Sequence, residues 1–121
     1  MSERFGAVKM KGNPLTLIGN EVKVGDKAPD FTVVTKSLSP ANLASYAGKK
    51  KIISVVPSLD TGVCSIMTKR FNTEASKLGD DVVVLTISMD LPFAQARWCG
   101  AEGVDRVETL SDYMAADFGM K

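Results

Sequence analysis

The stretch from Ile52 to Ile87 constrains the fold most, because two apolar runs flank a segment with helical periodicity. The runs Ile52–Val56 and Val82–Ile87 are nearly continuous in apolar residues, which is typical of strands covered on both faces. Between them, apolar residues recur at helical spacing, and Gly79 ends the pattern. This order predicts two parallel strands joined by a right-handed helical crossover. The apolar positions of the predicted helix are Val63, Met67, Phe71, Ala75 and Leu78.

The N-terminal residues 11–25 predict a β-hairpin. The turn pair Gly19-Asn20 follows the apolar run Leu15–Ile18. After the turn, Val22 and Val24 alternate with polar residues, which favours a second strand.

Shorter elements are predicted on either side of the strand, helix and strand unit. They are a strand over Phe31–Thr35, a helix opened by Ser39-Pro40 and ended by Gly48, a helix that starts at Asp90-Leu-Pro92 and ends at Gly100, a strand over Val107–Leu110, and a last helix capped by Ser111-Asp112 and running to Phe118. Because strands and helices alternate, we expect one α/β domain over residues 1–121 with a mostly parallel sheet.

Composition narrows the functional classes. The chain has 121 residues and a net charge of +1, with neither a basic stripe nor an acidic tail, so we expect no nucleic-acid partner. The run Lys49–Lys51 is interpreted as the solvated start of a strand, with a phosphate-binding patch as the alternative. Residues 1–10 lack the apolar core of a secretory signal, and no segment has the length of a bilayer span. We therefore expect no membrane partner and a reducing compartment, the cytoplasm.

The sequence contains no histidine and two cysteines. The missing imidazole excludes Ser-His-Asp and Cys-His catalysis within this chain. Two cysteines without histidine cannot complete an ordinary four-ligand zinc site. We therefore predict neither a metal nor a cofactor. A nucleophilic cysteine in this chain must be activated by something other than an imidazole.

Cys64 is the leading candidate for a reactive thiol. It lies in the first turn of the predicted helix after a parallel strand, where unpaired amide N–H groups and the helix dipole favour an anion such as a thiolate. The Thr61 hydroxyl is close enough in sequence to donate to the sulfur or to a bound oxygen, and Pro57 can shield the sulfur from water. The alternative is a small buried hydrophobic residue. The spacing of Pro57, Thr61 and Cys64 favours a functional thiol.

Cys99 lies 35 positions after Cys64, in the next predicted helix, so the two do not form a C-x-x-C motif. Two interpretations stay open: a core cysteine, or a thiol that resolves an oxidised Cys64 as a disulfide. Both cysteines lie on helices, and a disulfide needs Cα atoms about 4.4–6.8 Å apart. We therefore predict that one or both helices unwind locally when the disulfide forms. Gly100 and Gly103 would ease such unwinding.

Three segments resemble the peroxiredoxin family. The segment Pro57-Ser-Leu-Asp-Thr61-Gly-Val-Cys64 matches the P-x-x-x-T-x-x-C motif of peroxiredoxins in general. The segments Leu91-Pro-Phe-Ala-Gln-Ala-Arg-Trp-Cys99-Gly-Ala-Glu-Gly103 and Gly12-Asn-Pro-Leu-Thr are similar to its thiol peroxidase (Tpx) subfamily. The likeness covers nearly the whole chain, from Lys11 to Gly119.

The resemblance implies a thioredoxin-like fold with an N-terminal hairpin and an atypical 2-Cys mechanism. Cys64 would be the peroxidatic thiolate, and Cys99 would resolve its sulfenic acid as an intramolecular disulfide that thioredoxin reduces. Thr61 and the Cys64 N–H would hydrogen-bond the peroxide, and Pro57 would shield the site. The resemblance also implies a homodimer and a role in antioxidant defence.

The chain departs from the family pattern at its C-terminal side. The family carries a catalytic arginine in a C-terminal portion that this sequence lacks, and two further strands and a final helix are missing with it. We therefore expect a C-terminally truncated domain in which Ile52–Val56 becomes an apolar sheet edge. Two alternatives to a peroxidase stay open: a redox sensor that relays oxidation to a partner protein, and an inactive fragment with two core cysteines.

Overall fold

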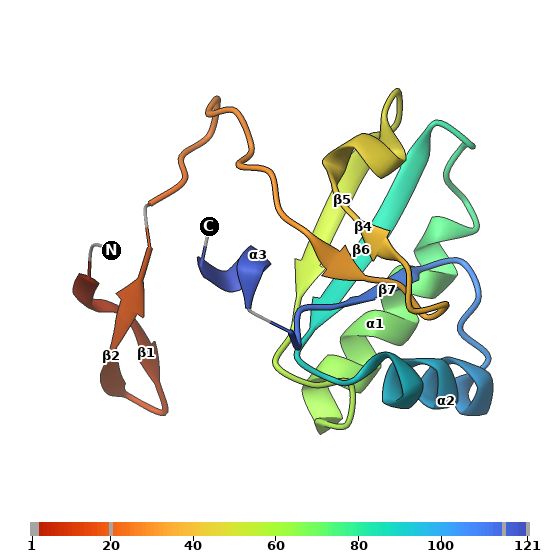
Figure 1. Cartoon of the computed structure of the whole chain (residues 1–121). Helices are drawn as coiled ribbons and strands as arrows, with labels where there is room; N and C mark the ends of the chain where they lie inside the picture. The colour runs from red at the N-terminus through yellow and green to blue at the C-terminus, as the bar shows by residue number, and fades with distance from the viewer. Residues whose placement is uncertain (1–2, 20, 115, 121) are drawn as a thin grey trace.

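The computed structural model describes residues 3–19, 21–114 and 116–120, and a five-stranded sheet forms its centre (Figure 1). The strand order is β4-β3-β7-β6-β5. The strands of this sheet are β3 (Val33–Val34), β4 (Pro40–Ala41), β5 (Lys50–Val55), β6 (Val82–Ser88) and β7 (Glu108–Ser111). The helices are the 3-10 helix η1 (Leu43–Tyr46), α1 (Gly62–Ala75), α2 (Pro92–Glu102) and α3 (Asp117–Met120).

The parallel part of the sheet confirms the predicted strand, helix and strand unit. β5 pairs with β6 in parallel, in a register that sets Ile52 opposite Val84, and α1 connects the two strands. β6 pairs in parallel with β7, and α2 connects them. The short strands β3 and β4 complete the sheet in antiparallel sense. All three parallel strands therefore present their carboxyl ends at the same edge.

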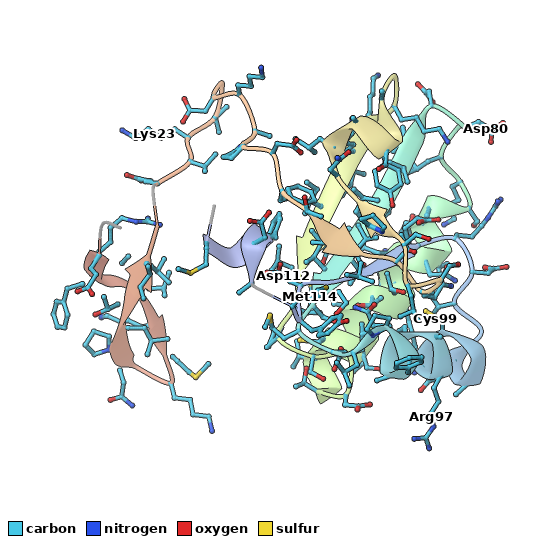
Figure 2. All side chains as sticks on the ribbon, in the orientation of Figure 1. Lys23, Asp80, Arg97, Cys99, Asp112 and Met114 are labelled. Atoms are coloured by element: carbon cyan, nitrogen blue, oxygen red, sulfur yellow. The ribbon has the colours of Figure 1, made fainter. Side chains whose placement is uncertain are left out.

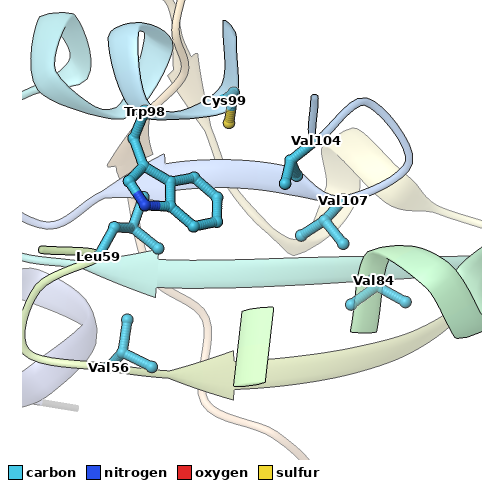
Figure 3. Packing of buried hydrophobic residues seen from close by; sticks show 7 residues of the cluster. All are labelled: Val56, Leu59, Val84, Trp98, Cys99, Val104 and Val107. Atoms are coloured by element: carbon cyan, nitrogen blue, oxygen red, sulfur yellow. The ribbon is translucent and has the colours of Figure 1, made fainter. Parts of the chain in front are cut away.

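Side chains alternate along β6, so this strand contributes to two separate cores. Val84 belongs to a cluster on the face that α1 and α2 cover (Figure 3). Leu85, its neighbour, is fully buried in a second cluster on the opposite face. The first cluster consists of Val56, Leu59, Val84, Trp98, Cys99, Val104 and Val107, and is called the helix-side core below.

The opposite face is covered by irregular segments and short helices. Phe31 and Phe118 pack there edge to face, with ring centroids 4.9 Å apart. Asp112 is buried, and its carboxylate accepts the amide N–H groups of Phe118 and Gly119, which holds α3 against the end of β7. Asp112 thus caps a helix, but the predicted boundaries were wrong, because Ser111 belongs to β7 and α3 runs from Asp117 to Met120.

The N-terminal hairpin is present, but its turn lies elsewhere than predicted. Its strands are β1 (Glu3–Met10) and β2 (Asn13–Ile18), and Figure 1 shows them apart from the main sheet. The turn is Lys11-Gly12, where both residues have positive φ (51° and 82°), as a two-residue hairpin turn requires. Gly19 follows the end of β2, and Asn20 lies outside the described residues. The exposed Val22 and Val24 form no strand, so the predicted turn and second strand were wrong.

Several predicted helix boundaries were also wrong. Pro40 belongs to β4, and the helix start comes at Asn42, whose side chain and that of Ser45 cap each other's backbone N–H groups. This reciprocal capping box is more favourable than the predicted start at Ser39-Pro40. α1 ends at Ala75 rather than at Leu78. α2 continues through Gly100 to Glu102 and ends at Gly103, which adopts the left-handed conformation at φ 67°.

β5 forms one edge of the described sheet, as the sequence predicted (Figure 1). Its apolar side chains Ile52 and Val55 are exposed. Among the described residues, no helix has both the length and the apolar character that a bilayer crossing needs.

The two-core arrangement predicts the cost of truncating Leu85. We expect Leu85→Ala to lower the free energy of unfolding by about 2–5 kcal/mol, because the residue is completely buried at the middle of the sheet. The control Leu78→Ala removes the same atoms from an exposed site and should cost about 1 kcal/mol or less. Urea unfolding followed by circular dichroism measures both. Equal losses would contradict the proposed packing.

Candidate active site

The candidate site lies where β5 ends and α1 begins. Residues 56–61 connect the two elements, and Cys64 is the third residue of α1. Pro57 is exposed, and its carbonyl oxygen accepts the Met89 N–H at 3.2 Å, which ties the connecting loop to the end of β6. The structure therefore places Pro57, Thr61 and Cys64 at the same edge of the sheet.

Cys64 is a free, half-buried thiol. Its side chain packs against the helix-side core, together with Met67 and Phe71 of the same helix. The fully buried Thr68 donates its hydroxyl to the Cys64 carbonyl oxygen at 2.8 Å, which fixes the first turn of α1. One side of the thiol thus meets apolar side chains, while the residue keeps partial access to solvent. Val63 of the same helix points toward solvent and is 79% exposed, so its predicted core position was wrong.

Thr61 occupies the N-cap position of α1 without capping it. Its backbone is extended (φ −86°, ψ 146°), but its side chain makes no hydrogen bond to the helix N–H groups. The hydroxyl instead donates to the Ser58 carbonyl oxygen at 3.0 Å. The first amide N–H groups of α1 therefore lack a side-chain acceptor, and the positive end of the helix remains available to an anion.

The two cations nearest to Cys64 in the sequence are paired with other residues. Lys69 forms an ion pair with Glu102 of α2 at 3.2 Å. Arg70 binds Glu74 at 2.9 Å, and this hydrogen bond lowers the pKa of Glu74. Neither ion pair involves Cys64, so both cations are engaged with carboxylates away from the thiol.

Cys99 is a second free thiol, and it is buried in the middle of α2. Figure 3 shows its sulfur on the sheet-facing side of the helix beside Trp98, and in Figure 2 Arg97 points away from the sheet. The Cys99 Sγ lies 3.8 Å from the Thr109 Oγ1 of β7. Cys64 packs against the cluster that contains Cys99, so the two thiols share one apolar core without being bonded.

The segment after Cys99 is held by contacts from α1. The Asn72 side-chain oxygen accepts the amide N–H groups of Asp105 and Arg106 at 3.1 and 2.7 Å. The ion pair between Lys69 and Glu102 adds a second link between the helices. Movement of Cys99 out of the core would therefore break polar contacts as well as apolar packing.

One residue that sequence analysis missed connects this site to its surroundings. Asp90 follows β6, and its carboxylate accepts hydrogen bonds from the Ser58 hydroxyl, the Leu59 N–H and the Ser88 hydroxyl. In the sequence it appeared only as the start of a helix. The signal that could have found it is its place directly after a buried parallel strand, beside the loop that follows the neighbouring strand.

Comparisons with known proteins agree with this architecture. Residues 23–121 match the family described as Redoxin. The chain is 65% identical over 112 residues to a thiol peroxidase of Bacillus subtilis (strain 168), covering 93% of this chain and 66% of that protein. It is 63% identical over 114 residues to a thiol peroxidase of Oceanobacillus iheyensis, covering 94% of this chain and 69% of the relative. The chain thus spans about two thirds of the length of these curated relatives.

Solved structures show the same fold. A peroxiredoxin-like protein from Aquifex aeolicus superposes with a TM-score of 0.83 at 44% identity, covering 90% of this chain and 63% of that one. A thiol peroxidase from Chromobacterium violaceum gives a TM-score of 0.76 at 24% identity, covering 89% and 62%. The predicted thioredoxin-like α/β fold with an N-terminal hairpin is thereby confirmed.

The different burial of the two thiols predicts different alkylation rates. We expect iodoacetamide to modify Cys64 first in the reduced, folded chain, because Cys99 reacts only after α2 opens. Mass spectrometry of quenched samples should find one adduct early and two adducts only in denaturant. Cys99→Ser serves as the control and should keep the fast adduct. Equal modification of both thiols in the folded chain would contradict this assignment.

Proposed function

Because this chain belongs to the Redoxin family and is homologous to thiol peroxidases over nearly its whole length, we propose that it reduces peroxides through Cys64. The observation that supports this most is the half-buried free thiol in an uncapped first helical turn, three residues after Thr61. An uncapped helix start favours a thiolate, which is the nucleophilic form of cysteine. The proposal extends to hydrogen peroxide and organic hydroperoxides as substrates.

In the first step, the Cys64 thiolate attacks one peroxide oxygen. A sulfur–oxygen bond forms as the oxygen–oxygen bond breaks, and the second oxygen leaves as water or an alcohol after gaining a proton. Cys64 is oxidised to a sulfenic acid while the peroxide is reduced. The Cys64 N–H, at the uncapped helix start, is proposed to hydrogen-bond the peroxide, and Pro57 to limit access of water.

The orientation of the Thr61 hydroxyl refines its proposed role. Its proton is directed to the Ser58 carbonyl oxygen, so its oxygen lone pairs are the groups left to face a ligand. We infer that Thr61 accepts a hydrogen bond from the peroxide O–H and so orients the attacked oxygen toward Cys64.

In the second step, Cys99 is proposed to resolve the sulfenic acid. Its thiol attacks the Cys64 sulfur, a disulfide forms, and the oxygen leaves as water. A dithiol reductant, proposed to be thioredoxin, then returns both cysteines to thiols. Because Cys99 is buried and Asn72 of α1 holds the segment that follows its helix, this step is proposed to need local opening of α2.

The wider setting is part of the same proposal. A homodimer, a cytoplasmic location and a role in antioxidant defence follow from the resemblance to thiol peroxidases. Since the chain spans about two thirds of those relatives, its own turnover must be measured on this chain. Repeated consumption of peroxide with thioredoxin and its reductase identifies a peroxidase. A single oxidation without turnover would instead identify a redox relay, and an inert thiol would identify an inactive fragment.

Cysteine substitutions separate the two chemical steps. We expect Cys64→Ser to abolish peroxide consumption, because the nucleophile is lost. Cys99→Ser should retain the first oxidation but yield sulfinic acid or disulfides between chains, since the resolving thiol is gone. Intact mass after one equivalent and after several equivalents of hydrogen peroxide distinguishes these products, because a sulfinic acid requires two equivalents. Unchanged peroxide consumption by Cys64→Ser would rule out the proposal.

Substitution of Thr61 tests its role toward the peroxide. We expect Thr61→Val to slow oxidation of Cys64 by about a hundredfold, the usual effect of losing one polar contact at a reacting oxygen. Thr61→Ser keeps the hydroxyl and should stay close to the wild-type rate. Stopped-flow fluorescence of Trp98, the single tryptophan, can follow both reactions. Equal rates for the valine and serine variants would remove Thr61 from the mechanism.

A further inference from the structure

The carboxylate of Asp90 gathers three hydrogen-bond donors at the carboxyl edge of the sheet. The Ser58 Oγ donates to Oδ1 at 2.6 Å, and the Leu59 N–H and Ser88 Oγ donate to Oδ2 at 2.8 Å each. Two of these donors belong to the loop between β5 and α1, while the third is the last residue of β6. Asp90 therefore fixes the loop that leads to Cys64 against the neighbouring strand.

A second set of contacts joins the same residue to α2 and β7. The Gln95 Nε2 donates to the Ser88 Oγ at 2.9 Å and to the Leu110 carbonyl oxygen at 2.8 Å, and Gln95 is completely buried. The Ser111 hydroxyl donates to the Asp90 carbonyl oxygen. Gln95 lies one helical turn before Cys99 in α2. The Asp90 network, formed by Asp90 with these partners, thus connects the loop that precedes α1 with the helix that carries Cys99.

Ser58 carries the effect of Asp90 to the candidate catalytic groups. The side chain of Ser58 binds Asp90, and its carbonyl oxygen accepts the Thr61 hydroxyl at 3.0 Å. The position of Ser58 therefore decides where the Thr61 oxygen points. The hydrogen bonds of Asp90 go to Ser58, Leu59, Ser88 and Ser111. Any effect of Asp90 on Cys64 therefore passes through these contacts.

We propose that Asp90 is a positioning residue for the oxidation of Cys64: it holds Ser58, and through Ser58 it aims the Thr61 hydroxyl oxygen at the peroxide. This inference rests on the proposed peroxidase function. A carboxylate suits the role because all three partners donate to it, and an ionised carboxylate only accepts. An asparagine at this position would lack the negative charge. Its amide NH2 group would also face at least one partner that donates a hydrogen bond, and that donor would lose its acceptor.

The primary test compares Asp90→Asn with Asp80→Asn. Asp80 is an exposed aspartate at the opposite end of β6 (Figure 2). We expect Asp90→Asn to lower the second-order rate of Cys64 oxidation by hydrogen peroxide by about tenfold or more, since small misalignments at a reacting centre are costly. Asp80→Asn should leave the rate unchanged. Ser58→Ala should slow oxidation similarly, and Ser58→Ala combined with Asp90→Asn should be no slower than the slower single variant. Additive losses, or a rate for Asp90→Asn within twofold of wild type, would overturn the proposal.

Alkylation of Cys64 by iodoacetamide distinguishes aiming of Thr61 from general damage to the fold. This reaction needs the thiolate but no aligned peroxide, so Asp90→Asn should change its rate by no more than about threefold, clearly less than it changes peroxide oxidation. Equal losses in both reactions would overturn the positioning role. A wild-type chain that is inert to peroxide would defeat the proposed function instead. Hydrogen exchange of the Leu59 amide then decides the structural claim, because an unaltered exchange rate in Asp90→Asn would show that Asp90 does not hold the loop.

Discussion

Parallel pairing of β5 with β6 is the constraint from which the site follows. It requires α1 to cross from the carboxyl end of β5 to the start of β6, so α1 begins at the sheet edge where both strands end. The first turn of α1, which contains Cys64, therefore lies beside the loop that follows β6, which contains Asp90. Asp90 contacts Ser58 and Leu59, which lie more than 30 positions earlier, because the topology brings two strand ends together.

Burial of Cys99 ties the proposed chemistry to local stability. In the reduced state this thiol contributes to the helix-side core, and Asn72 anchors the residues that follow its helix. A disulfide with Cys64 requires that packing to be given up. Gly103, in the left-handed conformation, already ends α2 four residues after Cys99, and the exposed Gly100 lies next to the thiol. Gln95 holds the N-terminal half of α2, whereas the C-terminal half carries Trp98 and Cys99, so opening of the C-terminal half exposes part of the helix-side core.

The sequence predicted the central architecture because long periodic segments determine it. Two apolar runs and the intervening helix gave β5, α1 and β6, and the resemblance named the family that the comparisons support. The hairpin turn was misplaced because Gly6 interrupts the alternation of β1 and because Lys11-Gly12 is a less distinctive turn signal than Gly19-Asn20. The Asp90 network was missed for another reason. Its members are ordinary polar residues far apart in the chain, and only the sheet register brings them together.

The uncapped start of α1 connects stability to the proposed reactivity. A threonine at the N-cap commonly stabilises a helix by about 1 kcal/mol through a hydrogen bond to its N–H groups. Thr61 instead donates to Ser58, which Asp90 holds in place. The stabilisation that a cap would give is therefore forgone at the position where the proposed mechanism places the Cys64 sulfur and a peroxide oxygen. In a chain without histidine, the proposed chemistry relies on backbone N–H groups and a hydroxyl in place of an imidazole, and the positioning role proposed for Asp90 requires no contact with the substrate.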